Sequence, residues 1–125
     1  MSEPMGGGEG MKIYLICPVR EINEETCKFI GEYVDKIESN GNSIHYPPRD
    51  VNQDDSTGLN ICLSHLRAIE KCDEVHIYWD VQSKGSHFDL GMAFALKKPI
   101  FLFGQGEPDN EGKSYLKVIQ GWPFK

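Results

Sequence analysis

Two carboxylates frame a short polar loop in the second half of the chain. Asp80 directly follows the apolar segment Glu74–Trp79, and Asp89 lies where the loop meets a second apolar segment. An ionised carboxylate in a partly dry crevice can attack an electrophilic sugar carbon or stabilise a cationic one. Two acids also allow a division of roles, one as nucleophile and one as proton donor or hydroxyl ligand. The pair is therefore a candidate for chemistry at a glycosidic carbon.

Each acid also has a plainer interpretation. The residues from Ser86 to Asp89 spell S-x-x-D, a variant of the capping box, in which Ser86 caps a helix and Asp89 reaches back to the cap amide. Asp80 can be an ordinary turn residue at a strand end. In the functional interpretation Asp89 lies in the first helical turn, faces the crevice and is held ionised by the field of the helix N-terminus. The residues alone leave both interpretations open.

The loop before Asp89 carries three further candidates for substrate binding. Gly85 and Ser86 would let a ligand approach the backbone closely. His87 could donate a hydrogen bond to a ligand, although a histidine in a loop often has no such role. No companion ligands are spaced around it for zinc, so we predict no metal and no cofactor.

Two of the three arginines follow predicted strands. Arg20 and Arg49 lie in loops that should converge, and a guanidinium presents a planar fork suited to phosphate or carboxylate. We therefore include both in the candidate binding site. The alternative is that they are solvated surface arginines, paired with Asp50 or Glu21.

The loops after the first and second strands supply the remaining candidates. The loop at Cys17 is too short for a phosphatase-type cysteine loop, so a nucleophilic role for Cys17 is disfavoured. We expect Pro18 and a helix start behind it to hold backbone N–H groups toward a ligand. Asp50 belongs to an acidic loop whose spacing matches no calcium site. Solvated acids are the plainer interpretation there, and binding of a ligand hydroxyl by Asp50 is the functional one.

Apolar periodicity predicts the elements that would position these residues. Strands are expected at 12–17, 43–46, 74–79 and 99–103, and helices at 22–39, 59–69, 88–96 and 115–119. Residues 88–96 are apolar nearly all round, which predicts a helix buried on every side. Strict alternation of strand and helix predicts an α/β fold, a flavodoxin-like doubly wound parallel sheet of four or five strands with helices on both faces. Ligands bind such sheets where the winding direction reverses, beyond the ends of the first and third strands.

Length and charge restrict the class of protein. The chain has 125 residues, which predicts a single domain over residues 11–125 after a flexible leader at 1–10. The formal net charge is −6 without a basic run, so neither a nucleic-acid polymer nor an acidic membrane surface is an expected partner. No apolar run is long enough to span a bilayer. The four cysteines form no C-x-x-C pair and read as buried, reduced thiols of a cytoplasmic protein.

Three stretches together resemble the nucleoside 2-deoxyribosyltransferase family, which includes deoxynucleoside monophosphate N-hydrolases. They are KIYLICPVR, CDEVHIYWD and GSHFDLGMAFALKKPIFLF, and the resemblance covers nearly all of residues 11–103. It implies a flavodoxin-like fold, catalysis without metal through a carboxylate nucleophile, and a glycosyl-enzyme intermediate. It also implies a homodimer or larger homo-oligomer in which a neighbour completes the site.

The resemblance implies roles for four residues. The nucleophile falls on Asp89, the hydroxyl of Tyr14 lies near it, Asp80 contacts the substrate and Arg20 suits a 5′-phosphate. Two positions depart from the family pattern. Asp89 stands where the family has glutamate, so the carboxylate is one methylene shorter, and Cys17 stands where glycine is common.

The function predicted on these grounds is N-glycosidic bond hydrolysis or 2-deoxyribosyl transfer on a nucleoside or nucleoside monophosphate. Hydrolysis is preferred because the arginines indicate a nucleotide. The alternative is a non-catalytic module that binds or senses a nucleotide on the same fold, and the shorter carboxylate is the reason to consider it. A protein-interaction domain is a third hypothesis, since fold alone does not exclude it.

Overall fold

The computed structural model describes residues 10–106 and 112–125, so the predicted leader at 1–10 lies outside the described residues except for Gly10. Strands and helices alternate along the chain as the periodicity predicts, except that two helices follow the second strand. The elements are β1 (Lys12–Ile16), α1 (Glu24–Ser39), β2 (Ser43–His45), α2 (Pro47–Asp50), α3 (Leu59–Lys71), β3 (Glu74–Trp79), α4 (Lys84–Ala95), β4 (Ile100–Gln105) and α5 (Tyr115–Gln120).

The strands form one parallel sheet of four strands in the order β2-β1-β3-β4. The prediction of a doubly wound parallel α/β fold is therefore confirmed. The chain moves from β1 outward to β2 and then returns across β1 to β3, so the winding direction reverses between β1 and β3. Cys17 and Asp80, the residues that follow these two strands, lie at the edge of the sheet where such folds bind ligands.

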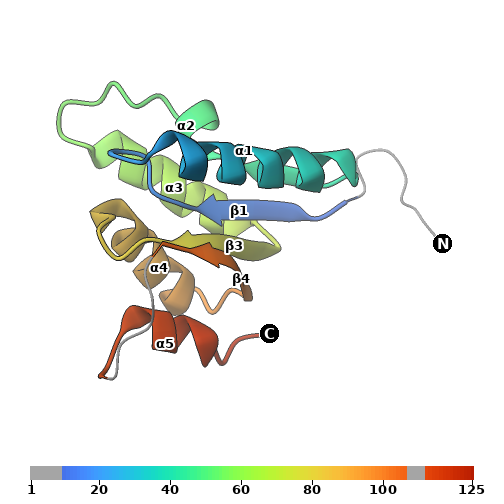
Figure 1. Cartoon of the computed structure of the whole chain (residues 1–125), viewed down its shortest axis with the longest axis vertical. Helices are drawn as coiled ribbons and strands as arrows, with labels where there is room; N and C mark the ends of the chain where they lie inside the picture. Colours follow the sequence, from blue (N-terminus) through green and yellow to red (C-terminus); the bar gives the residue numbers. More distant parts are fainter. Residues whose placement is uncertain (1–9, 107–111) are drawn as a thin grey trace.

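Helices cover both faces of the sheet, and Figure 1 shows α1 across the molecule from α4 and α5. Side chains alternate along β1, so Tyr14 and Ile16 join the core cluster beneath α3, α4 and α5. Ile13 and Leu15 point the other way, into the cluster beneath α1. The face that carries α3 and α4 is therefore also the face that receives the Tyr14 side chain.

Helix α4 differs from its prediction in where it begins and in how it is buried. It begins at Lys84 rather than Phe88, because the hydroxyl of Ser83 accepts a hydrogen bond from the Ser86 amide and caps the helix. It is not buried on every side, since Phe88 is 56% exposed and Phe94 47% exposed. The sheet and α3 cover only one side of α4. No other element covers the opposite side within the described residues, although that side is also apolar.

Two smaller expectations also need correction. A single helical turn, α2, follows β2 where a loop was predicted, since Pro47 and Pro48 supply the backbone angle that a first helical turn requires. Cys17 and Cys72 are buried and unpaired as expected, but Cys27 is exposed on α1. No helix in the described part of the chain combines the length and hydropathy needed to cross a membrane.

Gly104 in β4 allows a test of the packing around that strand, with Gly91 in α4 as the comparison. A Cβ added at Gly104 would lie 2.7 Å from the ring of Tyr78 and 3.0 Å from that of Phe29, whereas one added at Gly91 in α4 meets nothing within 4 Å. We expect Gly104→Ala to lower the free energy of unfolding by about 1–3 kcal/mol through overpacking. Gly91→Ala should raise it by about 0.5–1 kcal/mol through helix propensity. Urea unfolding followed by circular dichroism measures both, and effects of the same sign would contradict the described packing.

Candidate active site

The carboxylate of Asp89 is buried and held by two side chains from other elements. Asp89 is 5% exposed. Its Oδ2 accepts a hydrogen bond of 2.9 Å from the Tyr14 hydroxyl, and its Oδ1 lies 3.1 Å from Nδ1 of His65. The carboxylate therefore points away from the start of its own helix and into the space between α4, β1 and α3.

The capping-box interpretation of Asp89 is wrong. The cap is Ser83, and Ser86 lies inside the first turn of α4. The expected position of Asp89 in the first turn is also wrong, because the helix begins earlier than predicted and Asp89 falls in its second turn. The N-terminal field of the helix is correspondingly weaker at Asp89, since that field falls off within the first turn. Direct hydrogen bonds from Tyr14 and His65 stabilise the carboxylate there instead.

Three elements bring these groups together. Tyr14 occupies the centre of β1 and is fully buried, while α3 and α4 contact β1 and each other. His65 lies on the buried stripe of α3, one turn before Ile69. The ring of His65 meets the ring of Tyr14 edge-on, with 5.9 Å between centroids. The arrangement is a compact cluster of phenol, carboxylate and imidazole.

The electrostatics of the cluster keep Tyr14 protonated. Burial raises the pKa of the Tyr14 hydroxyl well above its ordinary value, and the charge and hydrogen bond of Asp89 raise it further. The phenol is therefore a hydrogen-bond donor at neutral pH, and the carboxylate is the acceptor. A carboxylate oriented by a neutral donor in a dry site is suited to act on an electrophilic carbon.

Cys17 lies close enough to Asp89 for the carboxylate charge to affect the pKa of its thiol. Burial raises the pKa of the Cys17 thiol to about 12, with Asp89 as the second cause. The thiol is therefore uncharged near neutral pH, and since the thiolate is the reactive form, Cys17 is a poor nucleophile. Pro18, the next residue, is also buried.

The remaining residues around the start of α4 have local partners. Asp80 accepts a hydrogen bond of 2.9 Å from the Gln82 amide, which is the turn arrangement of its plainer interpretation. The hydroxyls of Ser86 and Ser83 lie 2.8 Å apart, and Nδ1 of His87 lies 2.7 Å from the Ser83 carbonyl oxygen. No hydrogen bond joins Asp80 to the Tyr14–Asp89 pair within the described residues. A Cβ at Gly85 would meet nothing within 4 Å, so the backbone there is open.

The two candidate arginines differ in their surroundings. The guanidinium of Arg49 donates two hydrogen bonds, of 3.0 and 3.1 Å, to the carboxylate of Glu38 and also bonds Asp50. The hydrogen bond from Arg49 holds the pKa of Asp50 below its ordinary value. These contacts match the alternative of an arginine paired with Asp50. Arg20 is exposed in the loop after β1.

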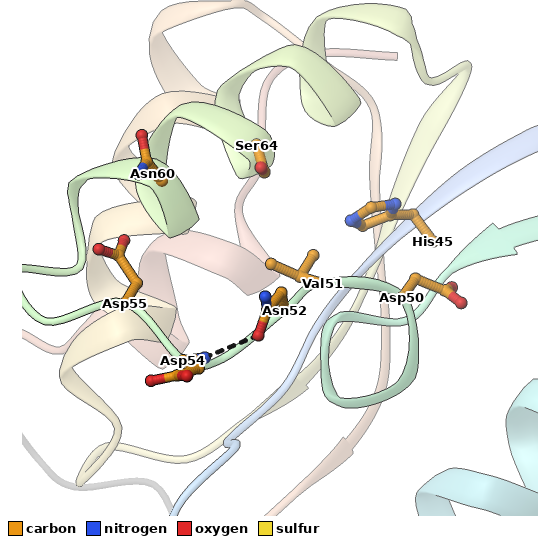
Figure 2. A pocket seen from close by; sticks show the side chains of 8 residues that line it. All are labelled: His45, Asp50, Val51, Asn52, Asp54, Asp55, Asn60 and Ser64. Atoms are coloured by element: carbon orange, nitrogen blue, oxygen red, sulfur yellow. Dashed lines mark hydrogen bonds between the residues drawn. The ribbon is translucent and has the colours of Figure 1, made fainter.

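A polar pocket of about 290 Å³ lies between β2, α3 and the loop that joins α2 to α3. Figure 2 shows the His45 ring from β2 and the Ser64 side chain from α3 directed toward it. The His45 ring also stacks on Tyr14, with centroids 5.3 Å apart and planes 14° apart. His45 thus connects the pocket to the Tyr14–Asp89 pair. Burial lowers the pKa of His45, so its ring is neutral at neutral pH.

Neither His45 nor His65 is among the site residues predicted from the sequence. Their Nε2 atoms are buried, and neither has a hydrogen-bond partner among the described residues. A signal for His65 exists in the sequence, because it interrupts the apolar stripe of α3 one turn before Ile69. His45 carries no comparable signal, since it ends a short strand. Within residues 10–106 and 112–125, no three His, Cys, Asp or Glu side chains gather in a way that could hold a metal ion.

Several solved structures share the fold of this chain. No family model and no curated protein matches the sequence. The CMP N-glycosidase BcmB of Clostridium botulinum aligns with a TM-score of 0.63 at 19% identity, over 89% of this chain and 81% of that protein. A 2-deoxyribosyltransferase of Bacillus psychrosaccharolyticus aligns with a TM-score of 0.62 at 21% identity, over 91% and 97% of the two chains. A 2-deoxyribosyltransferase of Leishmania mexicana aligns with a TM-score of 0.58 at 20% identity, over 75% and 64%.

These likenesses are at the level of fold. They confirm that the family resemblance seen in the three sequence stretches corresponds to a shared architecture. Fold does not by itself determine activity, so the chemistry of this chain depends on its own side chains.

Thiol labelling tests the surroundings of the cluster. We expect iodoacetamide at neutral pH to modify exposed Cys27 in the native protein and to leave Cys17 and Cys72 unmodified. Both buried thiols have a raised pKa, about 12 for Cys17 and about 11 for Cys72, so few thiolates are present. Labelling of both should follow unfolding in urea. Peptide mass spectrometry gives the rates, and labelling of native Cys17 as fast as that of Cys27 would contradict the burial described here.

Proposed function

We propose that the chain cleaves the N-glycosidic bond of a nucleoside or nucleoside monophosphate through the carboxylate of Asp89. The observation that carries the proposal is the buried hydrogen bond of 2.9 Å between Tyr14 and Asp89. Tyr14 lies three residues before Cys17, which follows β1 at the sheet edge where such folds bind ligands. The shared fold with an N-glycosidase and with deoxyribosyltransferases supports this choice of reaction class.

The chemistry proceeds in two displacements at one carbon. A carboxylate oxygen of Asp89 forms a bond to C1′ of the sugar while the C1′–N bond breaks, and the base leaves with the bonding electrons and takes up a proton. Water, or a second base in a transfer reaction, then attacks C1′ and releases the carboxylate. Each carboxylate oxygen has two acceptor positions, so the hydrogen bonds from Tyr14 and His65 leave one free on each.

The neighbouring residues have supporting roles in this proposal. Asp80 directly follows β3, the strand that pairs with β1, and is the candidate ligand for a sugar hydroxyl or donor of a proton to the leaving base. Arg20 is the candidate partner of a 5′-phosphate, because Arg49 already donates to Glu38 and Asp50. Hydrolysis of a nucleotide is therefore preferred over transfer between nucleosides.

Assembly as a homo-oligomer belongs to the same proposal. Phe88 and Phe94 leave an apolar side of α4 exposed, and Phe101 on β4 is 54% exposed. Large exposed apolar side chains support contact with another protein surface. A second copy of this chain would meet that requirement and could contribute residues to the site.

A base-release assay tests the central claim. We expect the wild-type protein to liberate free base from at least one member of a panel of nucleosides and nucleoside monophosphates, detected by chromatography. Asp89→Asn should lower kcat by about 10³-fold or more because the nucleophile is lost. Tyr14→Phe should lower it by about 10²-fold because one preorganised donor is removed.

Asp73→Asn is the matched control for the carboxylate change. Asp73 accepts a hydrogen bond of 2.7 Å from the Lys12 amide at the opposite edge of the sheet, and an asparagine oxygen can accept the same bond. The kcat of Asp73→Asn should equal that of the wild type. Absence of base release from the whole panel, or full activity of Asp89→Asn, would refute the proposed reaction.

A second candidate is ligand binding without turnover. It is favoured by the burial of Asp89, which at 5% exposure has little open surface for attack, and by its short side chain. A nucleotide that raises the melting temperature while no product forms over a long incubation would establish it. Measurable release of base would exclude it.

Arg20 decides between a nucleotide and a nucleoside substrate. We expect Arg20→Ala to raise KM for the monophosphate by about tenfold to a hundredfold, because a charge-assisted hydrogen bond contributes about 1.5–3 kcal/mol. KM for the matching nucleoside should not change. Arg49→Ala is the comparison variant and should alter neither KM, since its donors are used inside the protein. Equal KM changes for the nucleoside and the nucleotide would contradict a phosphate contact.

A further inference from the structure

We propose that His65 is a positioning residue that locks the short carboxylate of Asp89 in its reactive orientation. The inference rests on the proposed function, and it assigns a role to a residue that none of the sequence motifs contains. Its basis is the contact between Nδ1 of His65 and Oδ1 of Asp89, a distance of 3.1 Å between two buried side chains.

The two donors on Asp89 hold different oxygens. Tyr14 bonds Oδ2 from β1, and His65 bonds Oδ1 from α3. A single donor would leave the carboxylate free to rotate about its Cβ–Cγ bond. Two donors from separate elements fix the plane of the carboxylate as well as its position. A short side chain needs this restraint, because it cannot be adjusted over a longer stem and a displacement of about 1 Å can cost roughly a hundredfold in rate.

The surroundings of His65 define its tautomer. Asp89 is an acceptor, so Nδ1 of His65 carries the proton that lies between them. Nε2 is buried and has no partner among the described residues. With the proton on Nδ1, the Nε2 atom does not need to carry one, and no unsatisfied N–H donor is then placed in the core.

Packing alone does not account for a histidine at this position. His65 is 8% exposed and shares the buried stripe of α3 with Ile69. Burying an unsatisfied polar atom costs about 1–3 kcal/mol, a cost that leucine at the same position would avoid. The hydrogen bond to the buried carboxylate is the contact that offsets this cost. His65 is therefore better explained by what it does to Asp89 than by the volume it fills.

Substitutions at His65 separate positioning from packing. Leucine fills a similar volume without a donor, whereas the side-chain nitrogen of asparagine can occupy the place of Nδ1. We expect His65→Leu to lower kcat by about a hundredfold with KM unchanged, since misplacement of the carboxylate affects the chemical step. His65→Asn should recover most of the wild-type kcat. Full activity of His65→Leu, or equal impairment of both folded variants, would overturn the proposal.

His76 provides a matched control. It is also buried at 6% exposure and also contacts a carboxylate, with Nε2 2.6 Å from Oε1 of Glu74. It lies on the opposite face of the sheet, where the hydroxyl of Tyr33 on α1 contacts its other ring nitrogen. His76→Asn should retain the wild-type kcat. Should His65→Leu fail to fold by circular dichroism, His65→Asn decides alone, and a loss of more than about tenfold in that folded variant would overturn the role.

A measurement without substrate separates this inference from the proposed reaction. In a protein labelled with ¹⁵N at histidine, the imidazole shifts of His65 should show Nδ1 protonated and Nε2 bare, and Asp89→Ala should change them. Protonation at Nε2 with Nδ1 bare, or shifts that ignore Asp89→Ala, would overturn the contact. If the wild type releases no base, the proposed function fails, and these shifts still decide whether His65 holds the carboxylate.

Discussion

A carboxylate buried at 5% exposure is the constraint on which the candidate site depends. A charge removed from water is tolerated only when donors replace the lost hydration. Tyr14 and His65 supply those donors to Asp89, one to each oxygen. Asp89 in turn raises the pKa of Tyr14 beyond what burial alone does, so the phenol stays a donor. The hydrogen bonds and the charge of the cluster thereby orient the carboxylate and keep the phenol protonated.

The winding of the chain makes this cluster possible. β1 lies between β2 and β3, so α3 and α4 both pack on the face that receives the Tyr14 side chain. In Figure 1, α3 and α4 flank β1 and β3 from segments that are distant from β1 in the sequence. Parallel strands with right-handed crossovers place their loops at one edge of the sheet. The same winding brings the polar pocket beside His45 to that edge.

The sequence by itself determined the architecture and the pair at its centre. Short apolar runs that alternate with helical patterns predict a parallel α/β sheet. Helices cover both faces of such a sheet, so its strands are apolar throughout. The four strands and their helices are confirmed. The motif resemblance placed Tyr14 beside Asp89, and the two side chains do meet. The strands and helices are predictable from local patterns because backbone geometry and burial act over a few residues, whereas the Tyr14–Asp89 pair was predicted only from the resemblance.

Only the tertiary structure decided which polar groups surround that pair. His65 and His45 reach Tyr14 from separate elements, a contact that no short window of sequence contains. The first residue of α4 also depended on a competition between Ser83 and Ser86 as the cap, and Ser83 prevailed. The hydrogen bond from Arg49 on α2 to Glu38 on α1 forms because these two helices lie close together. The contacts of His65 and His45 with Tyr14, in contrast to the local choice of cap, depend on how separate helices and strands pack together, which only folding sets.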